Sequence, residues 1–234
     1  MTDPAPSASP FFPDGRSMLE RMLAGDPYLA DDPVLEEMNA RAERLVERFN
    51  ATSVTELPDR RRLLAELLGS CGRDVVVRPP LRVDYGVHLH LGDRTFVNVN
   101  LVALDCAEIR VGADVQIGPN VQLLTATHPL QPGPRRDKWE GAAPITLEDN
   151  VWLGGGVIVG PGVTIGRDTV VGAGAVVISD LPAGVVAVGV PARVLRELPQ
   201  DPDGGWSRLA VDGGDQAAAQ ATAGQAAGPE DPAS

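Results

Sequence analysis

A period of six residues runs through residues 147–180 and constrains the fold more than any other feature of the chain. An aliphatic residue opens each unit, and a second small or aliphatic residue stands four places later. Six is a multiple of the two-residue repeat of a strand but not of the 3.6-residue repeat of a helix, so we expect short strands joined by turns. The residues predicted to point inward are Leu147, Leu153, Val159, Ile165, Val171 and Val177, with Val151, Val157, Val163, Thr169, Ala175 and Leu181.

A fixed short period of this kind predicts a solenoid, in which each coil buries its aliphatic residues by stacking on the next coil. The glycines and the Asp and Asn residues between the apolar positions suit tight turns. Val111, Ile117 and Leu123 stand in the same phase upstream, so the repeat is interrupted and then resumes in register. A glycine-rich loop with chance spacing is the alternative, and six consecutive matches at two positions count against it.

Composition narrows the class of protein. Hydrophobic residues make up 43% of the chain and aromatic residues only 4%, which favours thin, regularly stacked coils over a large irregular core. The net charge of −12 counts against nucleic acid as a partner. With no secretory segment, no long apolar run and only two cysteines, Cys71 and Cys106, we expect a cytoplasmic protein that has no membrane partner and no structural disulfide.

Four segments are expected along the chain. Residues 1–16 and the acidic, Ala- and Gly-rich tail 199–234 have little to bury, and we expect both to be disordered. Residues 17–70 carry helical spacing and form a small cap, and residues 71–198 form the solenoid.

Two helices are predicted within the cap. Asp32 is a suitable N-cap and is followed by proline at the first helical position, with apolar residues at three- and four-residue spacing up to Asn50. A shorter helix opens at Pro58–Asp59, and Gly69 is placed to end it.

The interruption of the repeat at residues 128–144 is the first candidate functional segment. Prolines, charged residues and Trp139 break the period there, which predicts a loop leaving one corner of a coil. His128 opens this segment, and a neutral imidazole near pH 7 accepts a proton from an attacking hydroxyl, so His128 is the candidate general base. A structural turn histidine is the alternative.

The other two histidines offer a possible set of metal ligands. His88 and His90 are two residues apart on an expected strand and point the same way, so with His128 they offer a three-histidine zinc site of the kind that gamma-class carbonic anhydrases carry. The pattern of those enzymes includes two histidines four residues apart, which this chain lacks. We therefore expect no metal.

Three consecutive glycines, at residues 154–156, mark another candidate. Without side chains they let a ligand approach backbone N–H groups closely, which suits an oxyanion or a thin ligand. Turn glycines that serve only the corner are the alternative. The chain has no dinucleotide-binding or phosphate-loop motif.

A set of motifs resembles one known family, the maltose and galactoside O-acetyltransferases with the nodulation acetyltransferases, within the hexapeptide-repeat acyltransferases. The resemblance extends over roughly residues 17–198, including the helical cap. The motifs are Asp84-Tyr85-Gly86, Asn98-Val99-Asn100-Leu101, Thr125-Ala126-Thr127-His128-Pro129-Leu130, Asn150-Val151-Trp152-Leu153-Gly154-Gly155-Gly156, Pro161-Gly162-Val163-Thr164-Ile165-Gly166 and Gly189-Val190-Pro191-Ala192-Arg193-Val194.

The resemblance implies a fold and an activity. The fold is a mainly β, left-handed parallel β-helix of about eighteen residues per triangular coil with an N-terminal helical cap, a homotrimer with active sites between neighbouring subunits. The donor is acetyl-coenzyme A, and the acceptor is a sugar hydroxyl.

The resemblance also assigns roles at the acceptor side. His128 matches the base, Asn98 contacts the acceptor, and the backbone N–H of Gly155 stabilises the oxyanion. Asp84 and Asp105 match acceptor-contacting positions.

Asp32, or its neighbour Asp31, is a weaker assignment at the acceptor, since Asp32 also serves as an N-cap.

Two departures from the family pattern lie near Asn98 and Asp105 in the sequence. Phe96 replaces a frequent tyrosine, and Cys106 replaces the second acidic residue of the galactoside branch.

Further matches fall on the coenzyme. Ala173, Ile178 and Ser179 match positions along the pantetheine arm, and Gly155 contacts the same ligand. Arg193 and Arg196 match the basic residues that meet the nucleotide phosphates, a pairing that guanidinium geometry favours.

Other functions remain open from the sequence. One is O-acetylation of a different acceptor, such as an antibiotic, as in the xenobiotic branch of the same superfamily. The others are a zinc-dependent hydratase and a non-catalytic solenoid.

Overall fold

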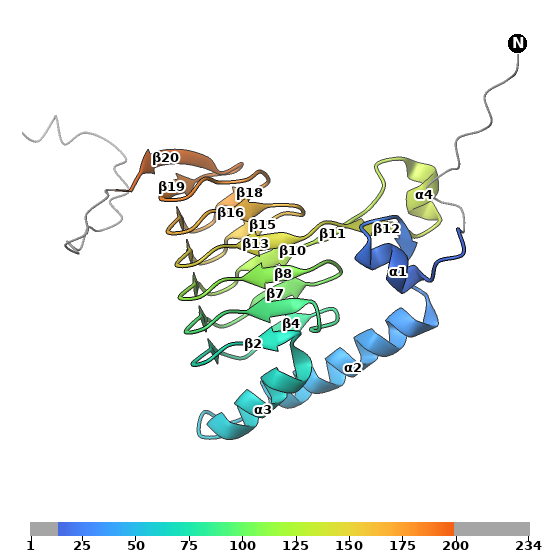
Figure 1. Cartoon of the computed structure of the whole chain (residues 1–234), viewed down its shortest axis with the longest axis horizontal. Helices are drawn as coiled ribbons and strands as arrows, with labels where there is room; N and C mark the ends of the chain where they lie inside the picture. Colours follow the sequence, from blue (N-terminus) through green and yellow to red (C-terminus); the bar gives the residue numbers. More distant parts are fainter. Residues whose placement is uncertain (1–13, 199–234) are drawn as a thin grey trace, which may run out of the picture. The chain divides into compact units, whose positions relative to one another are not determined.

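The computed structural model describes residues 14–198, so our predictions for residues 1–13 and for the tail 199–234 lie outside the described part. Short parallel strands stack into a solenoid whose coils are visible side by side in Figure 1. The solenoid confirms the fold class, a parallel β-helix with few helices.

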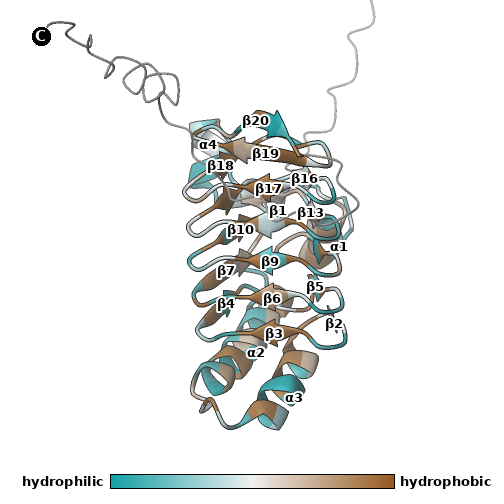
Figure 2. Ribbon diagram, turned by 90° about the vertical axis from the view of Figure 1, so that its left-hand side faces the viewer, coloured by the Kyte–Doolittle hydropathy of each residue, from teal (hydrophilic) through white to brown (hydrophobic). Residues whose placement is uncertain are grey.

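Each coil passes through three sheets in turn, which we call face 1, face 2 and face 3. Face 1 consists of β2 (Ser70–Cys71), β5 (Leu89–Leu91), β8 (Ile109–Val111), β13 (Ile145–Leu147) and β16 (Thr164–Ile165). Face 2, seen in Figure 2, consists of β3 (Val76–Val77), β6 (Phe96–Val97), β9 (Gln116–Ile117), β14 (Trp152–Leu153), β17 (Val170–Val171), β19 (Val185–Val188) and β20 (Arg193–Glu197). Face 3 consists of β4 (Leu81–Val83), β7 (Leu101–Leu104), β10 (Gln122–Leu124), β15 (Ile158–Val159) and β18 (Val176–Val177).

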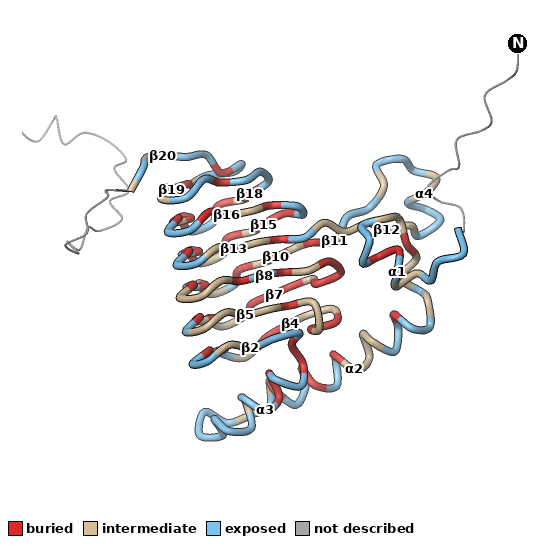
Figure 3. The backbone as a smooth tube through the Cα atoms, viewed as in Figure 1, coloured by how far each residue is buried: buried red, intermediate tan, exposed pale blue. Residues whose placement is uncertain are grey.

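The inward ladder of the solenoid is the one that the six-residue period predicts. Every inward residue predicted between positions 147 and 181 is buried, with at most 6% of its surface exposed. Figure 3 shows these buried positions recurring along the coils. Thr169 is the polar member of the ladder, and its hydroxyl donates to the carbonyl of Pro182 at 2.6 Å, which satisfies it.

The corners explain the glycine and Asp or Asn positions. Asp114, Asn150 and Asp168 have φ between 58° and 61°, in the left-handed region that these residues tolerate better than most. Gly92 serves a different need, because a Cβ there would lie 2.7 Å from the backbone nitrogen of Ala113 in the next coil. Stacked corners therefore require both positive φ and missing side chains.

Coil length changes along the solenoid. Residues paired in adjacent early coils are twenty positions apart, as for Val102 and Gln122, whereas the later pair Ile158 and Val176 is eighteen apart, as expected. Between them, Gln122 pairs with Ile158 across the interruption, thirty-six positions on. The interruption therefore adds one whole coil length, and this keeps the repeat in register.

The extra residues gather at one corner, between face 3 and face 1, which we call corner 3/1. Inward Ala103 on face 3 and Val111 on face 1 are eight positions apart, against six from Val159 to Ile165. Corner 3/1 is thus widened in two early coils and opened further by the excursion in the third.

Two helices of the cap close the first end of the solenoid (Figure 1). Helix α2 (Pro33–Asn50) has the predicted N-cap, since the side chain of Asp32 accepts from the backbone of Val34 at 2.9 Å. Helix α3 (Leu57–Leu67) begins one residue earlier than predicted and ends two residues before Gly69. Apolar residues of both helices join the core of the solenoid, so the cap covers the open end of the ladder.

The excursion at residues 128–144 is more regular than the loop that we predicted. It contains α4 (Pro132–Arg136) and β12 (Trp139–Ala142). Strand β12 pairs antiparallel with β11 (Ala126–Thr127), which directly precedes the excursion, and with the cap strand β1 (Tyr28–Leu29). Helix α1 (Met18–Leu23) lies beside this small sheet (Figure 1). Because β1 comes from the distant cap, the pairing could not be read from the excursion alone.

Two further properties follow from the described residues. Both cysteines are free thiols, with Cys106 buried. No helix within residues 14–198 has the length and apolar character needed to cross a membrane.

We predict that Gly92→Ala destabilises the protein by about 1–3 kcal/mol, because the added methyl group overlaps the backbone of the next coil. Gly133→Ala is the matched control, since a Cβ at that helical position meets no atom within 4 Å. Thermal unfolding of both variants measures the difference. Equal melting temperatures for the two variants would contradict the requirement for a bare backbone at the corner.

Candidate active site

A cavity of about 380 Å³ lies at corner 3/1, between the cap, the solenoid and the excursion. Its size suits a small-molecule ligand. All three parts of the chain contribute lining residues, which are Ala30, Leu35, Glu36, Asn39, Asp84, Tyr85, Leu104, Cys106, Ala126, His128 and Glu140.

His128 stands at the mouth of the excursion, directly after β11, and its side chain is exposed. The structure places it in the cavity lining together with Asp84 and Glu140. The candidate base therefore has solvent access and carboxylate neighbours within the same cavity.

Asp84 lies in the turn that follows β4 and is half-buried. Its Oδ2 accepts a hydrogen bond from the thiol of Cys106 at 3.3 Å. Burial raises the pKa of the Asp84 carboxyl, the Cys106 thiol lowers it, and the nearby charges of Asp105 and Glu140 raise it again. Burial, together with the charge of Asp84, also raises the pKa of Cys106, so its sulfur keeps its proton and acts as the donor.

Asp105 does not reach the cavity. It is fully buried, and its carboxylate accepts from three backbone N–H groups of the preceding corner, those of Asp84 at 3.1 Å, Tyr85 at 2.8 Å and His88 at 3.1 Å. We expected this side chain to contact the acceptor, but in the structure it binds the backbone of the preceding turn. Asp105 thereby fixes the backbone that carries Asp84 into the cavity.

Asn98 and Gly155 lie elsewhere, at the corner between face 2 and face 3, which we call corner 2/3. Asn98 follows β6, and its Oδ1 accepts from the guanidinium of Arg78 at 3.1 Å. Gly155 follows β14 on a later coil. A strand of face 3, four residues in β7, separates this corner from corner 3/1, a span of about 13 Å at the usual rise of a strand.

The predicted coenzyme residues are divided in the same way. Ala173 follows β17 at corner 2/3, whereas Ile178 and Ser179 follow β18 at corner 3/1, and all three are exposed. Arg193 and Arg196 lie on β20, the antiparallel strand at the far end of face 2.

Asp32 is confirmed as the N-cap of α2 and does not line the cavity. Its side-chain oxygen is already an acceptor for the backbone of Val34.

The three histidines do not form a metal site. The Nδ1 of His88 bonds to the carbonyl of Asp105 at 2.8 Å, and that of His90 bonds to the hydroxyl of Ser70 at 3.0 Å. Within residues 14–198, no group of three or more His, Cys, Asp or Glu side chains is arranged to hold a metal ion. His88 and His90 are therefore each hydrogen-bonded to a neighbouring residue of the solenoid.

Several lining residues were missed by the sequence reasoning. No role in the site is predicted for Cys106 from the sequence, yet Cys106 lines the cavity and donates a hydrogen bond to Asp84. Glu140 carries no local signal, because its position depends on the pairing of β12 with β1. Glu36 and Asn39 project from α2, where helical spacing alone marks them as polar surface.

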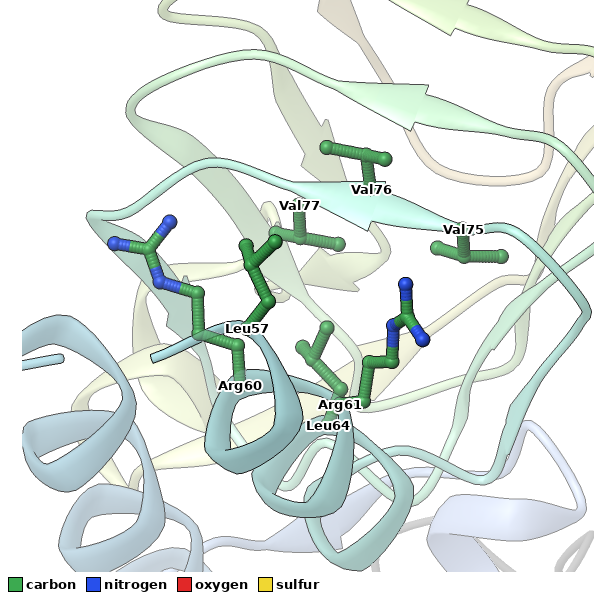
Figure 4. Close-up of a pocket in the computed structure, with 7 residues that line it drawn as sticks. All are labelled: Leu57, Arg60, Arg61, Leu64, Val75, Val76 and Val77. Carbon is green, nitrogen blue, oxygen red and sulfur yellow. The ribbon is translucent and has the colours of Figure 1, made fainter. Parts of the chain in front are cut away.

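A second cavity, of about 110 Å³, lies between α3 and β3 (Figure 4). Leu57, Leu64 and the valines of β3 line it, with Arg60 and Arg61 beside them. The guanidinium of Arg60 donates to Thr52, and no carboxylate, histidine or thiol lines this cavity. The cavity at corner 3/1 differs from this one because His128 and three carboxylates line it.

Family models match two segments of the chain. The maltose acetyltransferase hexapeptide capping motif matches residues 21–72. The bacterial transferase hexapeptide model, with six repeats, matches residues 144–179.

Relatives cover most of the described chain. Nodulation protein L of Rhizobium meliloti is 41% identical over 179 residues, which are 76% of this chain and 98% of that protein. Galactoside O-acetyltransferase of Escherichia coli is 38% identical over 181 residues, 77% of this chain and 89% of that protein.

Solved structures agree with these matches. A maltose O-acetyltransferase from Clostridium difficile superposes with a TM-score of 0.78 at 39% identity, covering 79% of this chain and 99% of its own. A hexapeptide-repeat acetyltransferase from Vibrio cholerae, solved with acetyl-coenzyme A, gives a TM-score of 0.74 at 38% identity, covering 79% of this chain and 100% of its own.

We predict that Asp105→Ala destabilises the protein by about 2–4 kcal/mol, because it leaves one buried and two partly buried N–H groups without an acceptor, at about 1–3 kcal/mol for a fully buried group. Glu108→Ala, in the same corner but with its side chain 44% exposed, is the control, and a change within about 1 kcal/mol is expected. Chemical denaturation measures both. A mild effect at Asp105 would show that the turn is held by other contacts.

Proposed function

Because the chain belongs to the hexapeptide-repeat acetyltransferases, the family of the galactoside and maltose O-acetyltransferases, it is an acyltransferase, and we propose that it transfers acetyl from acetyl-coenzyme A to a sugar or glycoside hydroxyl. The observation that carries the proposal is the cavity at corner 3/1, where His128 stands among carboxylates. Carboxylate oxygens accept hydrogen bonds from sugar hydroxyls, and a neutral imidazole accepts the proton of the reacting one. Support for the donor comes from the relative solved with acetyl-coenzyme A.

The proposed reaction is a direct transfer. His128 takes the proton of the acceptor hydroxyl as its oxygen attacks the thioester carbonyl carbon. The backbone N–H of Gly155 donates to the oxyanion of the tetrahedral intermediate. The carbon–sulfur bond then breaks, the proton passes from His128 to the departing thiolate, and the products are the acetyl ester and coenzyme A.

Two further roles complete the proposal for the coenzyme. Ala173 at corner 2/3 and Ile178 and Ser179 at corner 3/1 are all exposed, and we assign them to the pantetheine arm. Arg193 and Arg196, on the terminal strand β20, offer guanidinium groups to the nucleotide phosphates.

A homotrimer with sites between subunits fits the separation of the two corners. One chain holds His128 at corner 3/1 and holds Asn98 and Gly155 at corner 2/3, so a complete site requires a second copy. Face 2 also carries an outward column in which mostly apolar residues pair in register across successive coils. The column is Val76, Phe96, Gln116, Trp152 and Val170.

Apolar surface of this kind is typical of a subunit interface, and Val76 and Trp152 are 51% and 43% exposed in the single chain. We further propose that residues 17–70 act as the cap of the solenoid formed by residues 71–198. Cytoplasmic localisation stays a proposal that rests on the two free thiols.

We predict that His128→Ala lowers the rate of acetyl transfer by about a hundredfold or more, while the melting temperature and coenzyme A binding stay unchanged. His90→Ala is the control, because His90 lies on face 1 outside the cavity lining. Release of coenzyme A with maltose, glucose, galactosides, chitin oligomers and chloramphenicol measures the rates. Near-full activity of the His128 variant would contradict its role, and activity with chloramphenicol alone would favour the xenobiotic reading.

We predict that two inactive variants, His128→Ala and Asn98→Ala, recover activity when co-assembled. A mixed trimer forms some sites that take His128 from one chain and Asn98 from its neighbour, about a quarter of all sites at equal mixing. The measurement compares co-refolded chains with each variant refolded alone, and sedimentation reports the subunit number. Failure of the co-refolded trimers to regain activity would place both residues of a site in one chain.

A further inference from the structure

The cavity at corner 3/1 is lined by three carboxylates, those of Glu36, Asp84 and Glu140, and none of its lining residues is Lys or Arg. Hydroxyl recognition by itself does not call for such an excess of negative charge, since neutral groups also accept hydrogen bonds from a sugar. The lining therefore carries three acidic side chains and no Lys or Arg side chain that balances them.

Glu140 is oriented by the cap. Its residue pairs with Tyr28 across the antiparallel strands β12 and β1, and the buried hydroxyl of Tyr28 donates to Glu140 Oε2 at 3.1 Å. The contact joins residues 112 positions apart. A buried tyrosine from another segment thus holds this carboxylate at the cavity.

Asp84 is oriented from the solenoid side. The side chain of Asp84 accepts a hydrogen bond from the thiol of Cys106. The backbone N–H of Asp84 donates to the carboxylate of Asp105, and the backbone carbonyl of Asp84 accepts from the side-chain amide of Asn39 at 2.9 Å. Main chain and side chain are both held, so Asp84 faces the cavity without rearrangement on binding.

The two carboxylates have no cationic partner in the described chain. The charge of Glu140 disfavours the charged form of Asp84, and a neutral ligand that displaces water from the cavity would leave both side chains less well solvated. Within residues 14–198, no group of three or more His, Cys, Asp or Glu side chains is arranged to hold a metal ion that would balance these negative charges. A ligand that brings its own positive charge removes this cost.

We propose that the acceptor carries an ammonium group, as an amino sugar does, and that Asp84 and Glu140 bind this group while a hydroxyl of the same molecule faces His128. The proposal rests on the proposed acetyl transfer and specifies its acceptor class. A protonated amine has no lone pair with which to attack the thioester, so the acetyl group goes to the oxygen and the amine stays free. The new ester bond replaces the carbon–sulfur bond of the thioester, and the hydroxyl proton passes through His128 to the thiolate of coenzyme A.

The experiment compares three sugars that differ at one position: glucosamine, glucose and N-acetylglucosamine. We expect kcat/KM, from coenzyme A release, to be at least about tenfold higher for glucosamine than for either neutral sugar, corresponding to about 1.4 kcal/mol. Glu140→Gln and Asp84→Asn should each reduce this preference. Glu37→Gln is the matched control, because Glu37 lies next to Glu36 on α2 but outside the cavity, and its preference should match that of the unaltered protein.

Each outcome decides a separate point. Equal kcat/KM for glucosamine and glucose, a preference that survives both substitutions, or a product acetylated on nitrogen by mass spectrometry and NMR would overturn the ammonium site while leaving acetyl transfer intact. If no sugar is acetylated, the proposed function fails. Calorimetry then compares the binding of glucosamine and of glucose to the unaltered protein, and it serves equally if a variant does not fold. Tighter binding of glucosamine supports the ammonium site. Equal binding of the two sugars overturns it.

Discussion

The stacking of one coil directly on the next is the interaction on which the rest of the structure depends. Each coil buries its aliphatic residues only against its neighbours, and the ladder ends at α2 and α3, whose apolar faces continue the same core. Close stacking also dictates the corners. Gly112 lies so near the next coil that a Cβ would come within 2.7 Å of the backbone nitrogen of Asp149, so the corner tolerates no side chain there.

The candidate site arises where this regularity is relaxed at one corner in three successive coils. Two extra residues in each early coil create room for the turns that begin at Asp84 and Asp105, and the third coil adds the whole excursion. The buried carboxylate of Asp105 compensates for the lost regularity, because it accepts the backbone donors that strand pairing no longer satisfies. A rigid stack and a fixed irregular corner together hold the cavity open, and the cap supplies its remaining wall.

Local signals predicted local structure well. The N-cap of α2 was foreseen because Asp32 and the proline after it act within a single turn, and the inward ladder because its period repeats many times. The sequence predicted where the excursion begins and ends but not its strand and helix. Strand β12 pairs with the strand that contains Tyr28, more than a hundred residues away, and no local pattern predicts that pairing. The family resemblance places Asp105 at the acceptor, whereas the burial of its side chain depends on the fold of the preceding coil. Glu140 was missed for the same reason.

The sequence by itself determined the class of fold, the phase of the coils, the end cap and the place where the repeat breaks, because each of these is a property of neighbouring residues or of a repeat along the chain. Only the tertiary structure decided which side chains share a cavity. It brought Glu36, Asp84, Glu140 and His128 from the cap, the solenoid and the excursion to one corner, and it left Asn98 and Gly155 at another. The physical reason is that a corner collects residues by stacking and by pairing across long separations, and neither is encoded in the spacing of the residues along the chain.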